Sequence, residues 1–472
     1  MNKKLLPLAV LTAVATGGLS TAQAVYVNNN GTGQVLIYPY YSVEGENDTY
    51  INIVNTTDQT KAVKVRFLEG MNSQEVLDFN LYLSPRDHWS AMVTESASGG
   101  ARLVTADEFC TVPDIVGRQG STVNFREFQY SDVDEVHNGI ERTREGYVEI
   151  IEMGVVTGDH EEWATHDSSG VPDNCGALID SWSTGGTWSN NRDMDIAPAS
   201  GGLSGYGVLI NPADGVSAAY DATAFGNFWS AGDWDHRRPG SVLPSLRSGQ
   251  ATAQVIDGNQ LYDVTFTDSV DAISATIMQS MIMNDFVLAP EINAGTDWVV
   301  NFPTKRFYVF PEPQFAADRP LRPFTTEWDP EKAEACEPIG MDYWDREERE
   351  EFVRDVDFSP TPTTDPISLC KEVNVVTFNE ANVLYASDRI GHNLDVAFDN
   401  GWMQIDFTRE TGRWMTGSNN VDETPLTFYG LPTIGFGVQR YTNGDLGGLL
   451  ANYMGLVNHK AVRDIRSGEA AD

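Results

Sequence analysis

The chain contains 472 residues, with 68 aspartates and glutamates against 31 lysines and arginines, so its formal net charge is -37. A nucleic-acid-binding protein needs a basic face to neutralise phosphates, and an isoelectric point near 4.3 argues against that class. Hydrophobic residues make up 41% of the sequence and aromatic residues 10%, which argues against intrinsic disorder. The length suggests two or three domains, each able to bury its own core.

Residues 1–24 have the parts of a secretory signal peptide. Lys3 and Lys4 make the start basic, an apolar run follows, and an A-x-A cleavage site ends at Ala24. A membrane anchor is the alternative, but the apolar run is short and Pro7 interrupts it. No later segment has the roughly 18 uncharged apolar residues of a membrane-spanning helix, so the mature chain has no predicted transmembrane segment. We therefore expect export, and removal of the two lysines takes the side-chain charge from -37 to -39.

Residues 25–115 are predicted to form an antiparallel, immunoglobulin-like β-sandwich. Val63, Val65 and Phe67 alternate with polar residues, so they fall on one face of a strand. Similar short runs recur at spacings of about 10–14 residues, with polar turns between them. The predicted strands are 35–38, 50–54, 62–67, 76–83 and 89–93.

Residues 116–472 are predicted to form a larger β-rich domain with one or two short helices. Glu149 and Glu152 lie on its first strand, and their polar surroundings predict a strand edge or a solvated face. Ser269 is the predicted N-cap of a helix whose apolar residues follow a 3.6-residue period as far as Met281. The predicted strands are 146–153, 207–212, 297–302, 306–310, 373–378, 401–407 and 431–440, with a long loop at 173–204 and a closing helix at 446–457.

Within this domain, residues 311–370 are predicted to form a proline-rich, acidic excursion. Nine prolines from Pro311 to Pro366 indicate irregular backbone. They flank a charged block at 342–351, which is compatible with a short solvated helix.

The mature sequence holds four cysteines, an even number that predicts two disulfides in an exported protein. Three pairings are open. Cys110–Cys175 and Cys336–Cys370 are favoured because each closes the shorter loop. A zinc site is not predicted, because no C-x-x-C pair or close Cys/His spacing occurs.

Two enzyme motifs are approached in the sequence but are incomplete, so no catalytic or cofactor-binding residue is predicted. The G-x-S-x-G nucleophile elbow fails around Ser204, because Tyr206 stands where its second glycine belongs. The H-E-x-x-H metal motif fails after His160, because Ala164 occupies the position of the second histidine.

Calcium is the one cofactor that the sequence suggests. Asp193 with Asp195, and Asp233 with Asp235, present alternate carboxylates on predicted loops, and calcium prefers clustered oxygen ligands. The alternative is a pair of solvated acidic loops, because so acidic a chain produces D-x-D pairs by chance.

Four tryptophans lie in or near glycine- and serine-rich tracts: Trp182, Trp188, Trp229 and Trp234. Exposed aromatic rings in such loops stack on sugars or anchor a protein partner. Packing in the core is the alternative.

Several segments together resemble an uncharacterised group of exported proteobacterial proteins that are described as cell-surface proteins. The likeness covers most of the mature chain. It implies a shared architecture and a location outside the cytoplasm, and it transfers no catalytic residue. The matching segments are 35–41, 52–56, 65–67, 83–85, 144–153, 295–305, 345–348, 372–375 and 431–436.

These observations predict an exported, non-catalytic protein of the cell surface, the extracellular matrix or an S-layer-like assembly. Its expected contacts are with other copies of the chain, cations or glycans. A soluble glycan- or ligand-binding protein is the first alternative, and a secreted hydrolase is the second. The periplasm is the alternative to a surface location.

Overall fold

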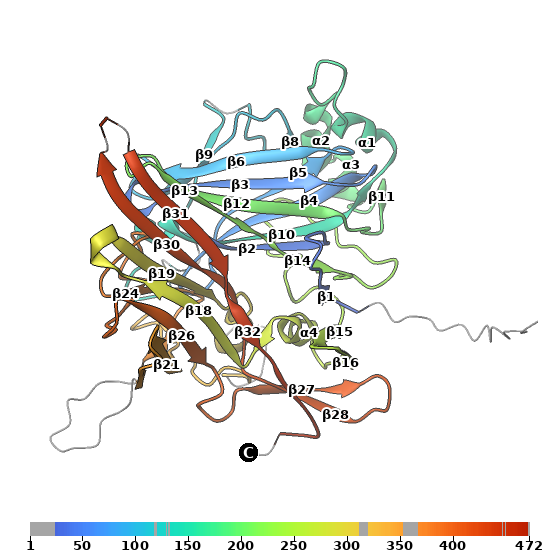
Figure 1. Cartoon of the computed structure of the whole chain (residues 1–472). Coiled ribbons are helices and arrows are strands. Elements are labelled where there is room, and N and C mark those ends of the chain that lie inside the picture. The colour runs from blue at the N-terminus through green and yellow to red at the C-terminus, as the bar shows by residue number, and fades with distance from the viewer. Residues whose placement is uncertain are drawn as a thin grey trace, which may run out of the picture.

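The structure is a computed structural model that describes residues 24–117, 120–128, 130, 133–310, 320–352, 367–445, 447–448 and 450–470. Residues 1–23 of the predicted signal peptide lie outside the described residues. The described chain is mainly β, with antiparallel sheets and a few short helices, as predicted (Figure 1). One strand pair, between β24 and β25, is parallel.

Two large sheets form the first sandwich. Sheet 1 has eight strands in the order β1-β14-β2-β10-β4-β5-β8, with β11 paired to β10. Its strands are β1 (Tyr26–Val27), β2 (Val35–Ser42), β4 (Thr60–Glu69), β5 (Glu75–Leu83), β8 (Cys110–Val112), β10 (Glu145–Val156), β11 (Ile196–Ala197) and β14 (Thr223–Gly226). Sheet 2 has six strands: β13 (Val216–Asp221), β12 (Leu203–Asn211), β3 (Asp48–Asn55), β6 (His88–Glu95), β7 (Ala101–Val104) and β9 (Thr122–Asn124).

This sandwich is larger than the predicted 25–115 unit. An immunoglobulin-like domain has about seven to nine strands, whereas sheets 1 and 2 of this sandwich have eight and six strands. Sheet 1 takes its central strand β10 and its strand β14 from beyond residue 115. Sheet 2 likewise takes β9, β12 and β13 from beyond that residue. The expected boundary at 115 therefore falls inside the sandwich. Strand pairing over such distances leaves no local trace in the sequence.

Sheet 1 is buried on both faces, which overturns the predicted solvated position of Glu149 and Glu152. All residues of β4 and β10 are buried. On the outer face, Arg66 forms ion pairs with Glu149 at 2.6 Å and with Glu75 at 2.7 Å. The coil that follows β14 covers this face, because the carbonyl oxygen of Pro244 accepts a hydrogen bond from Arg66 at 3.0 Å.

The second region contains a second sandwich. Sheet 3 comprises β22 (Glu350–Phe352), β21 (Gly340–Asp345), β26 (Asn400–Asp406), β18 (Met281–Val287) and β32 (Lys460–Val462). Sheet 4 comprises β25 (Gly391–Leu394), β24 (Val373–Phe378), β19 (Ala294–Asn301), β30 (Ile434–Asp445) and β31 (Leu450–Asn458). Phe286 of sheet 3 stacks on Phe378 of sheet 4, with ring centroids 5.2 Å apart. On its other side, sheet 4 packs on the first sandwich, where Phe436 stacks on Tyr220 at 5.1 Å.

Sheet 5 lies at the bottom of the molecule in Figure 1, and the first and last segments of the described chain both contact it. It comprises β15 (Thr252–Asp257), β16 (Gln260–Thr265), β27 (Trp414–Asn419), β28 (Pro425–Tyr429) and β33 (Asp464–Ser467). Val25, which follows the predicted cleavage site, forms a parallel bridge with Ala253 and is 1% exposed. Two-stranded pairs β17 (Met278–Gln279) with β29 (Leu431–Pro432) and β20 (Glu337–Pro338) with β23 (Ser368–Leu369) complete the β structure.

The helices differ from the predictions. The predicted loop at 173–204 contains α2 (Cys175–Trp182) and α3 (Thr187–Asn190), which pack with α1 (Gly158–Ala164) at one end of sheet 1 (Figure 1). The predicted helix from Ser269 to Met281 is only α4 (Ser269–Thr276), and Asp268 rather than Ser269 is its N-cap. It ends early because Met278 and Gln279 pair with β29.

Three other predictions are wrong for related reasons. The predicted strand at 306–310 is the short helix α5 (Arg306–Val309), the predicted helix in the charged block 342–351 is the hairpin of β21 and β22, and the predicted closing helix at 446–457 contains β31. In each case pairing or packing with distant segments overrides the local preference.

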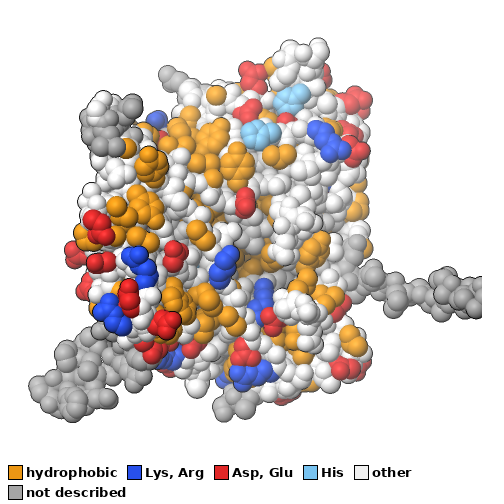
Figure 2. All heavy atoms as spheres, in the orientation of Figure 1, with side chains coloured by type: hydrophobic (Ala, Val, Ile, Leu, Met, Phe, Trp, Pro, Cys, Tyr) orange, Lys and Arg blue, Asp and Glu red, His pale blue; other side chains and the backbone are white. Residues whose placement is uncertain are grey.

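The outer face of sheet 2 carries an open apolar row. Val208, Tyr50, Met92 and Val104 are neighbours across β12, β3, β6 and β7, and Ala219 of β13 extends the row. Figure 2 shows hydrophobic side chains gathered over β3 and β6. Among the described residues, no helix is long and apolar enough to cross a membrane.

Candidate functional site

The helices at the end of sheet 1 bring together most of the residues that the sequence singled out. The disulfide Cys110–Cys175 ties the start of α2 to β8, as predicted. The aromatic–histidine cluster, as we call it, comprises Tyr82, His160, Trp182, Trp188 and His236. Trp188 lies at its centre, 4.3 Å from the ring of His160 and 4.8 Å from that of His236.

Burial keeps His236 neutral in this cluster, and two hydrogen bonds fix its tautomer. Its Nδ1–H donates to the carbonyl oxygen of Arg192 at 2.7 Å, which leaves Nε2 to accept from the Tyr82 hydroxyl at 3.2 Å. Trp182 in turn donates its indole N–H to the Tyr82 oxygen at 2.8 Å. Burial lowers the pKa of His236 to about 4, so the imidazole has no charge near neutral pH.

His160 joins an acid and a hydroxyl in the order found in serine hydrolases. Its Nδ1 lies 2.7 Å from the carboxylate of Asp195, and its Nε2 lies 3.2 Å from Ser181 Oγ. A nucleophilic serine must be accessible and must give its proton to the histidine. Ser181 is 4% exposed, and its hydroxyl donates to the carbonyl oxygen of Ala177 at 2.8 Å. The hydrogen bonds among Asp195, His160 and Ser181 therefore hold α1 and α2 together, and Ser181 is not an activated nucleophile.

The four predicted calcium ligands lie in this region but do not form a cluster. Asp235 is neutralised by Arg192 at 2.8 Å and by Arg237 at 2.6 Å, and Asp195 is paired with His160. Asp193 lies 3.8 Å from Arg192, and Asp233 is exposed. Three of the four carboxylates thus face basic side chains instead of converging on one cation.

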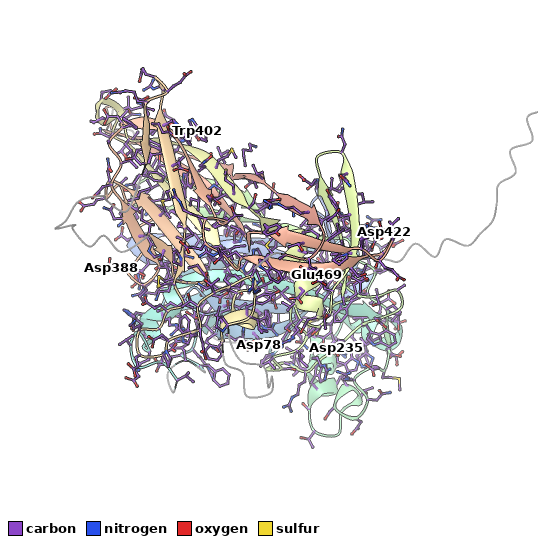
Figure 3. The ribbon with its side chains drawn as sticks, turned by 90° about the horizontal axis from the view of Figure 1, so that it is seen from below. Asp78, Asp235, Asp388, Trp402, Asp422 and Glu469 are labelled. Atoms are coloured by element: carbon purple, nitrogen blue, oxygen red, sulfur yellow. A yellow bond between two sulfur atoms is a disulfide. The ribbon has the colours of Figure 1, made fainter. Side chains whose placement is uncertain are left out.

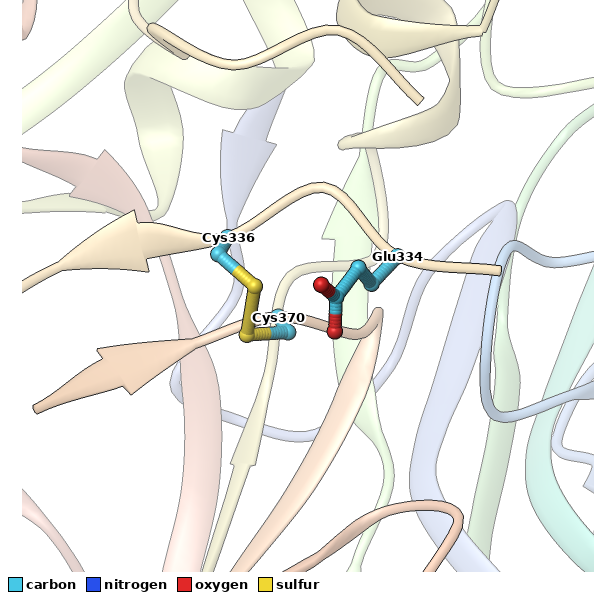
Figure 4. A group of neighbouring side chains, drawn as sticks. All are labelled: Glu334, Cys336 and Cys370. Carbon is cyan, nitrogen blue, oxygen red and sulfur yellow. A yellow bond between two sulfur atoms is a disulfide. The ribbon is translucent and has the colours of Figure 1, made fainter. Parts of the chain in front are cut away.

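Within the described residues, one group has the spacing of a metal site: Glu334 with Cys336 and Cys370 (Figure 4). These two cysteines form the second predicted disulfide. Metal-binding cysteines act as thiolates, and disulfide sulfurs carry no such charge. The two cysteines therefore form a structural disulfide that links the parts of the excursion around residues 336 and 370, and the group is not a metal site.

The predicted tryptophan contacts are largely internal. Trp188 and Trp229 are buried, and the indole N–H of Trp229 donates to the carbonyl oxygen of Glu152 at 2.7 Å. Trp182 and Trp234 are half-buried and pack against the core beneath α2. Burial removes Trp188 and Trp229 from the surface on which a glycan would stack.

A tryptophan pair that sequence reasoning missed lies on the outer face of sheet 3. Trp344 of β21 and Trp402 of β26 are directly opposite each other, and their rings stack with centroids 4.2 Å apart and planes 17° from parallel. Trp402 is 40% exposed. Figure 3 shows it at the opposite end of the molecule from Asp235.

Polar groups surround this pair, which we call the tryptophan platform. The neighbouring row holds Asp342 and Gln404, whose amide donates to that carboxylate at 3.2 Å, and Asp285 of β18 lies opposite Trp402. A sugar ring offers an apolar C–H face to an indole and hydroxyl groups to amides and carboxylates. The platform therefore has the parts needed for such a contact.

The sequence did contain a signal for this platform. At the start of the charged block and just before it, Met341 and Tyr343 are buried while Asp342 and Trp344 alternate with them, which is the two-residue period of a strand. The many charged residues that follow favoured a solvated helix, so this strand period was overlooked. Trp402 lies in the predicted strand 401–407, at a position that faces solvent.

Comparison of the chain with known protein families, with curated proteins and with solved structures finds no match. The resemblance to exported cell-surface proteins thus stays a prediction from the quoted segments.

Proposed function

We propose that this protein is an exported, non-catalytic protein of the cell surface or extracellular matrix that contacts glycans through the tryptophan platform. The two disulfides are compatible with an oxidising compartment. The predicted signal peptide supports export. The role is one of binding, because the candidate nucleophile Ser181 is buried and committed to another hydrogen bond.

The exposed stack of Trp344 and Trp402 is the observation that carries the glycan contact. A strand pair gains stability from stacked aromatic rings, but a buried position would supply the same contact together with desolvation. Trp402 instead leaves 40% of its surface accessible beside Asp285, Asp342 and Gln404. An accessible aromatic surface rimmed by polar groups suits a saccharide ring.

Titration with neutral oligosaccharides tests this function, with binding measured by tryptophan fluorescence and by calorimetry. We expect Trp402→Ala to weaken binding at least tenfold. This corresponds to a loss of about 1.4 kcal/mol of binding free energy, which is the size expected for one aromatic ring contact. Tyr453→Ala is the matched control, because Tyr453 is also an exposed aromatic residue, 62% accessible, on a different sheet. Absence of saccharide binding to the unmodified protein on a broad glycan panel would refute the proposal.

Contact between copies of the chain is a second candidate function, favoured by the apolar row of sheet 2. Two mature chains that each carry a side-chain charge of -39 repel one another, and an uncharged face is where that repulsion is weakest. Val208 lies within the row, between Tyr50 and Ala219. A second copy of the chain is therefore the occupant we propose for this face.

Light scattering over a range of protein and salt concentrations tests the self-contact. We expect Val208→Glu to abolish any association, whereas Ser168→Glu, which adds the same charge in an exposed turn, leaves it unchanged. A monomer at all protein concentrations in high salt, where repulsion is screened, would contradict this candidate.

A further inference from the structure

The hairpin of β15 and β16 ends in exposed apolar side chains. Ile256 and Leu261 are directly opposite each other near its turn, and they are 65% and 59% exposed. Val421, in the turn between β27 and β28, is 85% exposed, the highest value among the large hydrophobic residues of the described chain. We call these three residues the hairpin patch. Single exposed apolar residues are ordinary on a protein surface, but a group of them marks a contact site.

Hydrogen bonds hold the two turns of the hairpin patch together. Asn420 donates its backbone N–H to the carbonyl oxygen of Asp263 at 2.9 Å and its side-chain amide to the Asp263 carboxylate. Asp263 lies two residues from Leu261 and therefore on the same face of β16. The opposite face of the hairpin is anchored in the core through Val255 and Val264. The patch is thus the outer face of a fixed hairpin.

The charged residues beside the hairpin patch are all acidic. The sequence places no lysine, arginine or histidine within three positions of a patch residue. Four carboxylates lie within two positions of one: Asp257, Asp263, Asp422 and Glu423. Two such patches repel each other, so contact between the hairpins of two copies is disfavoured.

The apolar row of sheet 2 has a basic residue at one end. Arg102 lies two residues from Val104 on β7, so both side chains are on the outer face of the sheet. It is half-buried, and no acidic residue of the described chain forms an ion pair with it. Its neighbours across the strands, Thr94 and Asn124, are uncharged. Asp48, on the same face, is two strands away, which is about 10 Å by strand spacing.

The hairpin patch and the apolar row match in the spacing of their charges. Asp263 lies two positions along a strand from Leu261, and Arg102 lies two positions from Val104. Each charged side chain is therefore about 7 Å along its strand from an apolar one. A contact between the rows of two copies would leave the hairpin patch of both exposed. A contact between patch and row covers both apolar surfaces and sets a carboxylate beside an arginine.

We propose that the hairpin patch of one copy docks on the apolar row of sheet 2 of the next copy, with Asp263 beside Arg102. This inference rests on the self-contact proposed above and names the second surface that takes part in it. Figure 1 shows β15 and β16 at the lower right of the molecule and sheet 2 at the top, so one copy presents the two surfaces to different neighbours. Such head-to-tail contacts build open chains unless the rotation between copies closes a ring.

Sedimentation velocity of the full mature chain over a range of protein concentrations tests this contact. Three apolar side chains cover far less than the roughly 1,200–2,000 Å² of a stable interface, so we expect weak association that high concentration reveals. Arg102→Glu should weaken it about fivefold, because it sets a second carboxylate against Asp263. Val242→Asp is the control, because it adds a charge at an apolar residue that is 56% exposed outside both surfaces, and it should associate like the unmodified chain.

Mixing two blocked variants is the decisive experiment. Leu261→Asp blocks the hairpin patch and Val208→Glu blocks the row, so each variant alone should stay monomeric. Each variant keeps the surface that the other lacks. An equimolar mixture should therefore form a dimer with one copy of each variant and no longer chains, because every further contact is blocked.

The outcomes separate this inference from the self-contact on which it rests. Association of Leu261→Asp alone, to the same extent as the unmodified chain, would overturn the inference and leave a contact between rows. A mixture that stays monomeric would overturn it as well. No association of the unmodified chain would refute both the inference and the self-contact. Binding of the unmodified chain, but not of Leu261→Asp, to phosphatidylcholine vesicles would assign the patch to a membrane instead.

Discussion

At the scale of single residues, the most consequential feature is the set of charges buried along sheet 1. Lys61 and Glu152 are wholly buried and form an ion pair at 2.8 Å. Burial raises the pKa of Glu152 and the ammonium of Lys61 opposes that rise, while the backbone N–H of Gly201 donates to the carboxylate at 2.7 Å. Such a pair is satisfied only while both partners are present.

Lys61→Met is therefore expected to destabilise the protein by about 3–5 kcal/mol, because it leaves Glu152 buried without a counter-charge. Urea unfolding at pH 7 measures the change. The double variant Lys61→Met with Glu152→Leu removes both charges and should recover much of the loss. Equal destabilisation in the single and double variants would contradict this account.

His236 predicts how stability depends on acid. Its pKa falls from 6.5 to about 4 on folding, so the unfolded chain binds a proton more readily between those values. The stability that neutral His236 contributes is fully present above pH 6.5 and is lost as the pH falls to 4. A shift of this size corresponds to roughly 3 kcal/mol.

His236→Gln should therefore flatten the loss of stability between pH 7 and pH 4 in urea unfolding experiments. His392 and His459, whose pKa values burial also lowers to about 4, retain part of the slope in the variant. His88→Gln, in an exposed position, is the control. An unchanged slope in the His236 variant would show that the histidine is not buried as described.

At the scale of elements, the alternation of apolar and polar residues predicted where strands occur. It did not predict whether their polar faces are buried. Val63, Val65 and Phe67 identified β4, because one face of the strand enters the sandwich core. Arg66 lies on the other face of the same strand, and a coil more than a hundred residues away covers it. Its ion-pair partner Glu149 was predicted to be solvated and is buried. The local sequence pattern shows which residues are polar. It cannot distinguish a charged residue in a buried ion pair from a charged residue exposed to solvent.

The short helix α5 shows the opposite error. Phe307, Tyr308 and Val309 have strong strand propensity and predicted a strand. Lys305, just before them, is buried and donates from Nζ to the carbonyl oxygen of Ala335 at 2.7 Å. That long-range contact holds the segment as one helical turn, and propensity alone could not reveal it.

The predicted calcium sites can be tested at the level of their loops. Because Asp235 is held by two arginines and Asp195 by His160, we expect calcium to shift the melting temperature of the EDTA-treated protein by less than about 1 °C. Differential scanning fluorimetry with calcium, and with magnesium as the control, measures this. A calcium-specific rise of several degrees would restore the original prediction.

At the scale of the whole molecule, the candidate sites were the least predictable part. The disulfide pairing followed from loop length alone, and both bridges form as predicted. Tyr50, Val104 and Val208 lie on three strands that come together only in the folded chain. A single sequence carries no mark of that convergence.

The two sandwiches share one core, which predicts how the molecule unfolds. A single cluster of buried apolar residues runs from Val25 through both sandwiches to Val438. We therefore expect one cooperative transition in calorimetry, with calorimetric and van't Hoff enthalpies that agree. A repeated scan checks reversibility. Two resolved transitions would indicate that the sandwiches fold as separate units.

The buried bridge between Val25 and Ala253 would constrain when the predicted signal peptide is removed. The Val25 backbone N–H donates to the carbonyl oxygen of Thr252 and its carbonyl oxygen accepts from Gln254, both at 2.8 Å, and Ala24 beside it is fully buried. A peptidase needs an extended, accessible bond, so the predicted cleavage after Ala24 would have to precede the closing of sheet 5. The new α-amino group would then take the place of the Val25 amide as donor to Thr252, and release of the predicted leader would be an early step of folding.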